Sequence, residues 1–368
     1  MKKKINVLLV SVSFTPKSGV GIIEHGVLIY KGLKKYAKSI NVKAYSLSNK
    51  QLFERINKTN RNVTLQEDLA KGKLKGKPDI IHYISPGMFV SKLFFKPFFN
   101  IKSKQIVSVH DLDMLKKVPK IGIDKYINQA AAKGYMSIPV KMMNRFANAV
   151  EKKGMLLTIK KADYMLCVSE NTKKDLINYG VDPSKIFIIY NPIGDSFKNL
   201  GKKHRKDKII IGHISSYAYN KNAEVLINAF KKVKSDKFEL HLYGAKLPFE
   251  ISDDKRIKYF GYTDNTVKMY NSFDVFVFPS LWEGFGMPVM EAKRCKVPVI
   301  TYKKGELPHI VKRNTLQFKN QEDLTNMIEN MRWKRIDLSK AYNDTKECEE
   351  KVIIKKIEDM YKKAMEEK

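Results

Sequence analysis

The sequence predicts an α/β protein made of two doubly wound domains that face each other across a cleft. Three observations predict this fold class. Short apolar runs alternate with amphipathic stretches, as in parallel sheets covered by helices. The alternation occurs twice, on either side of a polar break. The length of 368 residues also suits two domains better than one.

The first half opens with a continuous apolar run at Ile5–Ser13 (INVLLVSVS), as expected for a strand buried on both faces. This run predicts a first strand and not a signal peptide, because no small-residue cleavage site follows it. A helix is predicted at Ile22–Tyr36, and another at Glu170–Tyr179 behind the capping residue Ser169. The further predicted strands of this half are Asp79–Ile84, Gln105–His110, Tyr164–Ser169 and Ile186–Tyr190.

A break at Asn191–Asp195 (NPIGD) and the basic stretch Gly201–Lys208 predict an interdomain linker. The predicted strands after it are Ile209–Ile214, Glu239–Tyr243, Ile257–Phe260, Val275–Pro279 and Val299–Tyr302. The predicted helices are Ala223–Val233, Val267–Ser272, Pro288–Cys295, Gln321–Met331 and Lys346–Met365. We therefore expect an N-terminal domain over residues 1–195 and a C-terminal domain over 196–345. A C-terminal helix over 346–368 is expected to pack back towards the N-terminal domain.

The charge of the chain is its unusual bulk property. The chain carries 70 Lys and Arg against 38 Asp and Glu, and residues 1–195 hold 35 basic and 14 acidic residues. Such a field would favour phosphorylated small molecules, an anionic membrane surface or nucleic acid. We expect no nucleic-acid partner, because no helix-turn-helix, zinc or RNA-recognition signature is present. A lysine-rich surface that only solvates the helices is the alternative.

Cysteine usage and hydropathy point to a cytoplasmic protein. Cys167, Cys295 and Cys348 are scattered and odd in number, which argues against a disulfide scaffold or a zinc site. No run of apolar residues approaches the eighteen that a transmembrane helix needs, so none is predicted.

The most informative segment is FPSLWEGFGMPVMEA, residues 278–292. It predicts a strand that runs into a turn and then into a helix opened by a proline. Gly284 and Gly286 would let backbone N–H groups approach a ligand, and the helix N-terminus offers positive potential to phosphate or hydroxyl oxygens. Glu283 lies in the turn and Glu291 about one turn into the helix, so a long ligand could meet a carboxylate at each end. The alternative is that both glutamates only cap or pair at the surface.

These glutamates, with seven residues between them in this setting, resemble the hallmark of the retaining glycosyltransferases of family 4. That family has the GT-B fold of two Rossmann-like domains. The resemblance covers nearly the whole chain. The other matching segments are Pro16–Gly21 (PKSGVG), Ser108–Leu112 (SVHDL), Lys161–Thr172, Ile188–Phe197 (IIYNPIGDSF), Tyr219–Phe230 and Gly261–Asp264 (GYTD).

The resemblance implies a binding site for a nucleoside-diphosphate sugar as donor. Glu291 would hold the ribose hydroxyls of the nucleotide, and Glu283 would hold the transferred sugar. The donor-binding turn would comprise Gly284, Phe285, Gly286 and Met287, of which the last three would hold sugar hydroxyls through their N–H groups.

Residues outside this segment complete the implied site. Lys221 would neutralise the diphosphate, as the chemistry also demands, because the leaving group gains negative charge. Gly19 and Gly21 would let the first loop close over that diphosphate. His110 would sit beside the sugar at the base of the cleft. A structural histidine at a strand end is the alternative interpretation of His110.

The sequence departs from the family pattern at three places. An arginine is common near the phosphate lysine, whereas Tyr217–Asn220 (YAYN) precede it here. Diphosphate binding is therefore expected either to be weaker or to be completed by another basic residue. Lys296 replaces the glycine that usually follows the helix of the second glutamate, which predicts a different helix end but an intact site. His309 stands where a glutamate is common, and we predict no role for it.

We therefore expect a retaining glycosyltransferase that moves a hexose-type sugar from a nucleotide donor to a glycan or a lipid-linked acceptor. No metal ion or other cofactor is implied, because no Asp-x-Asp triplet lies in a metal-binding context, and a lysine and a helix dipole can supply positive charge. No protein nucleophile is implied either. The alternatives are a sugar-nucleotide hydrolase or epimerase on the same fold, and a non-catalytic nucleotide-sugar-binding homologue.

A basic stretch at residues 92–161 is a candidate contact surface for a membrane that carries a lipid-linked acceptor. This stretch holds 15 basic and 4 acidic residues, interleaved with phenylalanines and methionines. Such a surface could rest on the anionic inner face of the cytoplasmic membrane as a peripheral contact. The alternative is that these apolar residues belong to the core.

Overall fold

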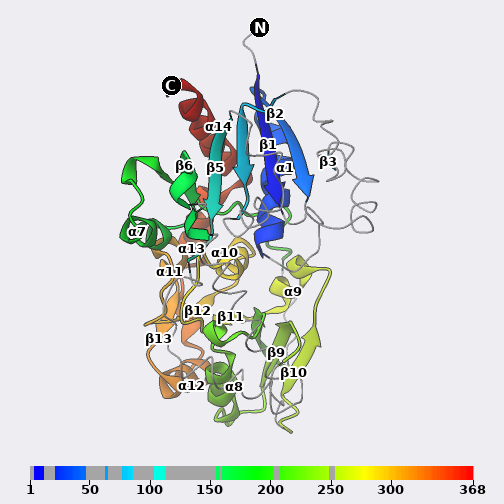
Figure 1. The fold of residues 1–368 in the computed structure, drawn as a ribbon. Coiled ribbons are helices and arrows are strands. Elements are labelled where there is room, and N and C mark those ends of the chain that lie inside the picture. Colours follow the sequence, from blue (N-terminus) through cyan, green and yellow to red (C-terminus); the bar gives the residue numbers. More distant parts are fainter. Residues whose placement is uncertain are drawn as a thin grey trace, which may run out of the picture. The chain divides into compact units, whose positions relative to one another are not determined.

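The computed structural model describes residues 4–11, 21–46, 63–64, 77–85, 103–112, 155–157, 159–201, 207–247 and 253–367. The chain divides into two compact units (Figure 1). The N-terminal domain consists of Met1–Pro192 together with Glu350–Lys368, and the C-terminal domain consists of Ile193–Glu349. The first crossing between them lies inside the polar break at residues 191–195.

The N-terminal domain is built on a seven-stranded sheet with the order β3-β2-β1-β4-β5-β6-β7. Every neighbouring pair of these strands is parallel. The strands are β1 (Ile5–Ser11), β2 (Ile40–Ser46), β3 (Val63–Thr64), β4 (Ile80–Tyr83), β5 (Lys104–Val109), β6 (Tyr164–Cys167) and β7 (Ile186–Ile188).

The described helices of this domain are α1 (Gly21–Tyr36), α7 (Glu170–Asn178), the 3₁₀ helix η3 (Pro183–Lys185) and α14 (Glu350–Glu366). Helix α7 begins as predicted, since the Ser169 side chain accepts a hydrogen bond from the N–H of Thr172. Helix α14, drawn in red in Figure 1, belongs to this domain although it ends the chain. It packs closely on α1, where a Cβ added to Gly32 would lie 2.5 Å from Cγ1 of Ile354.

A buried polar contact also ties α14 to the sheet. Nδ1 of His82 lies 2.6 Å from the hydroxyl of Tyr361, and Nε2 lies 2.8 Å from the hydroxyl of Ser108. All three side chains are fully buried. Burial lowers the pKa of His82 to about 3, so this imidazole is neutral at physiological pH. Both ring nitrogens are satisfied, which makes His82 a structural residue.

The C-terminal domain has a six-stranded parallel sheet with the order β10-β9-β8-β11-β12-β13. The strands are β8 (Ile209–Ser215), β9 (Phe238–Gly244), β10 (Ile257–Gly261), β11 (Val275–Phe278), β12 (Val299–Tyr302) and β13 (Leu316–Phe318). The described helices are η4 (Tyr219–Lys221), α8 (Ala223–Lys231), α9 (Thr266–Ser272), α10 (Met287–Arg294), α11 (His309–Lys312), α12 (Gln321–Glu329), η5 (Arg332–Arg335), α13 (Leu338–Asp344) and η6 (Thr345–Cys348).

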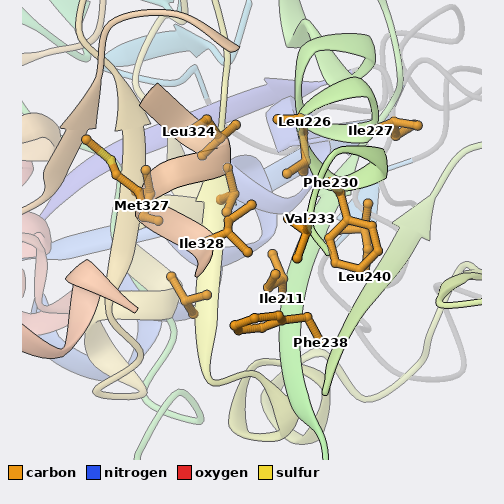
Figure 2. Packing of buried hydrophobic residues seen from close by; sticks show 14 of the residues in the cluster. Ile211, Leu226, Ile227, Phe230, Val233, Phe238, Leu240, Leu324, Met327 and Ile328 are labelled. Atoms are coloured by element: carbon orange, nitrogen blue, oxygen red, sulfur yellow. The ribbon is translucent and has the colours of Figure 1, made fainter. Parts of the chain in front are cut away.

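Strand β11 shows why its sequence is apolar without interruption. Val275 and Val277 join a core cluster with side chains of α8 and α12, which Figure 2 shows meeting over β8 and β9. Phe276 alternates with them and stacks on Phe273, their ring centroids 6.3 Å apart. Successive side chains of a strand point to opposite faces, so both faces of β11 are buried. The strand is thereby fixed in register, and with it the turn that follows.

In each sheet the strand order reverses at the centre. The chain proceeds from β1 towards one edge and from β4 towards the other, and in the second sheet it does the same from β8 and from β11. In open α/β sheets, ligands bind at such reversal points, outside the carboxyl ends of the two central strands.

Candidate functional site

The predicted donor-binding residues lie at the reversal point of the C-terminal sheet. Strand β8 leads through residues 216–218 into η4, which ends at Lys221, and the neighbouring β11 leads into the turn that contains Glu283. Residues about 60 positions apart are therefore brought together because their strands are adjacent and parallel.

The two loops are held against each other by one backbone hydrogen bond and two hydrogen bonds from asparagine side chains. The N–H of Leu281 donates to the carbonyl of Asn220 at 2.7 Å, and the amide of Asn220 donates to the carbonyl of Trp282 at 3.2 Å. The amide of Asn222 donates to the carbonyl of Pro279 at 3.3 Å. These contacts explain the asparagines on either side of Lys221, which fix one loop on the other.

Lys221 and Glu283 form an ion pair. Nζ of Lys221 lies 2.7 Å from Oε1 and 2.8 Å from Oε2 of Glu283. The lysine side chain is 21% exposed and the glutamate side chain 12%. The backbone of Glu283 is also fixed, because its N–H donates to the carbonyl of Glu306 at 3.1 Å. The two residues predicted to bind phosphate and sugar thus lie side by side, and each fixes the position of the other through the ion pair.

The turn ends in a helix N-terminus, as predicted. Gly286 caps α10 with φ 107° and ψ 47°, a left-handed conformation that favours glycine. A Cβ at this position would also lie 3.1 Å from Cγ1 of Val311. Helix α10 begins at Met287, one residue earlier than predicted. Gly284 is half-buried in this turn, and the side chain of Phe285 is buried and anchors it.

Glu291 is oriented by a residue that the sequence did not indicate. Oε2 of Glu291 accepts a hydrogen bond from the hydroxyl of Tyr270 in α9 at 2.8 Å. Tyr270 is fully buried, with its ring edge-on to Phe273 and Phe276. A tyrosine inside an amphipathic helix gives no sequence signal for this role, because only the packing of α9 brings it to α10.

A second unpredicted group orders the start of the Lys221 loop. Nδ1 of His213 lies 2.9 Å from the carbonyl of Val277, which can only accept, so Nδ1 carries the proton. Nε2 then accepts from the hydroxyl of Ser215 at 3.0 Å, and that hydroxyl accepts from the N–H of Tyr217 at 3.1 Å. Tyr217 has φ 55°, and its hydroxyl donates to the carbonyl of Tyr243 at 2.9 Å. Burial lowers the pKa of His213 to about 4, so this chain of hydrogen bonds is neutral.

The predicted residues of the N-terminal domain fall partly inside the described region. Gly19 lies outside it, and Gly21 is the first residue of α1. His110 follows β5 and is 8% exposed, and its Nε2 donates to the carbonyl of Ile84 at 3.0 Å. Burial lowers the pKa of His110, although Asp111 acts in the opposite direction.

The end of α10 corrects one expectation. Lys296 does not produce a different helix end, since it adopts the left-handed conformation itself, with φ 56°. The N–H of Lys296 donates to the carbonyl of Lys293, and that of Val297 donates to the carbonyl of Ala292, both at 2.9 Å. This is the Schellman pattern, with lysine in the place that glycine usually takes.

Three further observations concern the residues that the structure describes. The three cysteines are free and buried. No group of three or more His, Cys, Asp or Glu among these residues could hold a metal ion. None of the described helices combines the length and the hydropathy that a membrane span requires.

Both domains match family models of glycosyltransferases. Residues 45–197 match the model described as Glycosyltransferase Family 4, and residues 196–344 match the model described as Glycosyl transferases group 1. The second match contains the loops of Lys221 and Glu283 together with α10.

Two curated relatives match part of the chain. An uncharacterised 41.2 kDa protein in the cps region of Klebsiella pneumoniae is 26% identical over 47% of this chain and 52% of its own length. The N-acetylgalactosamine-N,N′-diacetylbacillosaminyl-diphospho-undecaprenol 4-α-N-acetylgalactosaminyltransferase of Campylobacter jejuni is 29% identical over 43% of this chain and 46% of its own length. The matched segments therefore span about half the length of these curated relatives.

Solved structures match over nearly the full chain. Anabaena Alr3699/HepE in complex with UDP and glucose aligns with a TM-score of 0.72 at 15% identity, over 98% of this chain and 100% of that one. Sucrose-phosphate synthase from Thermosynechococcus elongatus aligns with a TM-score of 0.70 at 17% identity, over 99% and 100%. These similarities show the fold. With the two family models, they show that the chain belongs to the glycosyltransferases of the GT-B fold.

Proposed function

We propose that the chain transfers a hexose-type sugar from a nucleoside-diphosphate sugar to a glycan or a lipid-linked acceptor. One observation carries this proposal. Lys221, Glu283 and the N-terminus of α10 meet at the reversal point of the C-terminal sheet, in the domain that matches the group 1 model. A cation, a carboxylate and a row of backbone N–H groups are what a diphosphate linked to a polyhydroxylated ring requires.

Each group has a proposed role. The ammonium of Lys221 would bind the diphosphate and leave Glu283 free to accept hydrogen bonds from hydroxyls of the transferred sugar. The N–H groups at Phe285, Gly286 and Met287 would contact the same sugar. Gly284 lies in the same turn, where the absence of a Cβ would leave room for the ligand.

Glu291 is proposed to bind the ribose of the donor nucleotide. Its carboxylate can accept hydrogen bonds from both ribose hydroxyls, and Tyr270 holds one of its oxygens in place. In the N-terminal domain, His110 is proposed to contact the sugar, and the loop of Gly19 and Gly21 is proposed to contact the diphosphate.

We propose that the anomeric configuration is retained. In such a transfer, the bond between C1 of the sugar and the phosphate oxygen breaks, and its electron pair stays on the leaving diphosphate. The acceptor oxygen bonds to C1 on the same face of the ring, and its proton passes to the leaving phosphate oxygen. Lys221 and the N-terminus of α10 would stabilise the negative charge that develops on that group. No protein nucleophile takes part in this scheme.

Metal independence is part of the proposal. Lys221 and the N-terminus of α10 would neutralise the negative charge of the leaving diphosphate in place of a metal ion. The transfer rate should therefore not change when EDTA is added. Loss of activity with EDTA, restored by Mg²⁺ or Mn²⁺, would show that a metal ion takes part.

The acceptor is proposed to be met at an anionic membrane surface. The net charge of +32 favours such a surface, and the name of the Campylobacter jejuni relative includes a diphospho-undecaprenol acceptor. The basic stretch at residues 92–161 lies mostly outside the described residues. Sedimentation with vesicles containing anionic lipid, at low and high salt, tests this proposal. Equal sedimentation with neutral and anionic vesicles would argue against it.

The donor is identified by a thermal-shift screen with UDP, GDP, ADP and their sugars, since a ligand that binds only the folded state raises the melting temperature. The Glu291→Ala variant should lose this shift and should turn over donor much more slowly, while circular dichroism verifies its fold. Wild-type donor turnover in that variant would contradict the assignment. Consumption of donor without transfer to any acceptor would instead indicate a hydrolase.

A further inference from the structure

Three buried polar side chains lie near the carboxyl edge of the N-terminal sheet, beside its reversal point. Ser11 ends β1, His110 follows β5, and His25 lies just over one turn into α1. Their exposed fractions are 1%, 8% and 3%. Strands β1, β4 and β5 are consecutive in the sheet, so the carboxyl ends of all three lie at the edge where α/β proteins bind ligands.

Two of these side chains lack the hydrogen bonds that burial normally demands. Within the described part of the chain, neither ring nitrogen of His25 has a hydrogen-bond partner. The hydroxyl of Ser11 has none there either. Leaving a buried polar group unsatisfied costs about 1–3 kcal/mol. Two such groups at a ligand-binding edge are explained if a bound molecule supplies the missing partners.

His110 shows where that molecule would lie. Its Nε2 donates to the carbonyl of Ile84, so Nδ1 carries a lone pair and can accept a hydrogen bond. The ring of His25 stands edge-on to that of His110, with centroids 4.5 Å apart and planes at 87°. The hydroxyl of Thr172 in α7 lies 3.4 Å from the carbonyl of His110, a weak contact that helps to hold this residue in place. The two imidazoles thus form one site, in which His110 is fixed and His25 is unsatisfied.

The chemistry of this site suits a neutral ligand. Burial lowers the pKa of both histidines, and the neighbouring His110 lowers the pKa of His25 further, so both rings are neutral at pH 7. A neutral imidazole offers one donor and one acceptor, and a serine hydroxyl offers both. This set matches sugar hydroxyls, which also donate and accept. A phosphate, which needs positive charge or several donors, is a poorer match.

We propose that His25 is a second sugar-binding residue of the N-terminal domain, exchanging a hydrogen bond with a hydroxyl of a hexose that lies beside His110. This inference rests on the proposed function. The hexose could be that of the donor or that of the acceptor, since both present the same hydroxyl chemistry. The hydroxyl of Ser11, at the end of β1, would bind the same ring.

The His25→Phe variant separates binding from structure. A phenyl ring is planar like imidazole and only one ring atom larger, so it can keep the edge-on contact with His110 while it removes both nitrogens. If His25 serves ligand binding, the variant should be as stable as the wild type or more stable, because two unsatisfied atoms disappear. If His25 were a structural residue with unseen partners, the melting temperature would fall. His25→Asn, which keeps a donor and an acceptor on a shorter side chain, is the second variant if the first does not fold.

Calorimetry with a nucleotide and its sugar measures the predicted loss. Each nucleotide is compared with its nucleotide sugar, UDP with UDP-glucose and GDP with GDP-mannose. The quantity compared between variants is the ratio of the dissociation constant of the nucleotide to that of its nucleotide sugar. If His25 binds the donor hexose, His25→Phe should lower the affinity for the nucleotide sugar by about twofold to tenfold and leave that for the nucleotide unchanged. The matched control is His82→Asn, which removes another buried histidine of this domain. It should lower the melting temperature without changing the ratio.

A second measurement tests whether His25 binds the acceptor sugar. With the nucleotide bound at saturation, saturation-transfer NMR detects methyl α-glucoside, methyl α-mannoside and methyl N-acetyl-α-galactosaminide. If His25 binds the acceptor hexose, the His25→Phe variant should lose this signal while its donor ratio stays at the wild-type value. An unchanged ratio together with unchanged signals, in a folded variant, would overturn the assignment of His25. A wild-type protein that binds none of the nucleotides would overturn the proposed function itself.

Discussion

Lys221 and Glu283 form an ion pair, with Nζ of the lysine 2.7 and 2.8 Å from the two carboxylate oxygens. Both side chains are mostly buried, so the pair is poorly screened by water. A diphosphate that binds Lys221 must therefore compete with Glu283 for the ammonium group. The carboxylate that is released then becomes available to the sugar.

The first prediction is that Glu283→Gln increases affinity for the nucleoside diphosphate without its sugar. The variant removes both the competing contact and a nearby negative charge, and the gain should be about threefold to tenfold. Calorimetry measures it. Transfer of the sugar should become slower in the same variant, because the contact with the sugar is weakened. Lys221→Met should weaken binding, and adding Glu283→Gln to it should bring a smaller gain, because only the effect of the removed negative charge remains. Weaker diphosphate binding in the single Glu283→Gln variant would contradict this competition.

The second prediction concerns the contact between Tyr270 and Glu291. Tyr270→Phe removes one hydrogen bond and should weaken nucleotide binding by about twofold to tenfold, whereas Glu291→Ala should weaken it by tenfold or more. Both losses should be much smaller with the 2′- and 3′-deoxy nucleotides, because these lack one of the ribose hydroxyls. An equal loss for ribose and deoxyribose forms would show that Glu291 acts elsewhere.

The parts of the fold that the sequence predicted are those with a local signal. Strands Ile5–Ser11 and Val275–Phe278 were both predicted, because each contains an uninterrupted apolar run, Val7–Val10 and Val275–Phe278, that is buried throughout. Strand β2 was missed, since Asn41 and Lys43 interrupt its apolar residues near a sheet edge. Strand β13 was missed because it has only three residues, of which Phe318 alone is buried.

The residues of the candidate site also divide into those with a local sequence signal and those that only the packing places. Glu283, Gly286 and Glu291 lie in one continuous segment, so their spacing along a strand, turn and helix could be read from the sequence. Tyr270 and His213 could not be found, because their partners are distant in sequence and are met only through packing. The pairing of Lys221 with Glu283 was not predicted either, since each had been assigned to a different part of a ligand.

The third prediction is that Lys296→Gly stabilises the C-terminal domain. Lysine is held at φ 56°, which glycine adopts without strain, and relief of that strain should add about 1 kcal/mol to the free energy of unfolding. The melting temperature should rise by about 2–4 °C. The lysine Nζ also lies 5.6 Å from the ring centroid of Tyr342, and Lys296→Ala controls for the loss of this contact. A rise in both variants would show that strain at this position is not the cause.

The fourth prediction is that the C-terminal domain loses stability in mild acid. Burial lowers the pKa of His213 from 6.5 to about 4, so between these values the unfolded state binds more protons than the folded state. The stability from this group is complete above pH 6.5 and is lost as the pH falls through 4, by roughly 3 kcal/mol. Urea unfolding followed by tryptophan fluorescence measures it, because both tryptophans, Trp282 and Trp333, lie in this domain. His213→Gln should be less stable at pH 7.5, because the hydrogen bonds to Val277 and Ser215 are disturbed, but its stability should vary less between pH 6.5 and 4. An equally steep decline in the variant would show that other groups cause the acid sensitivity.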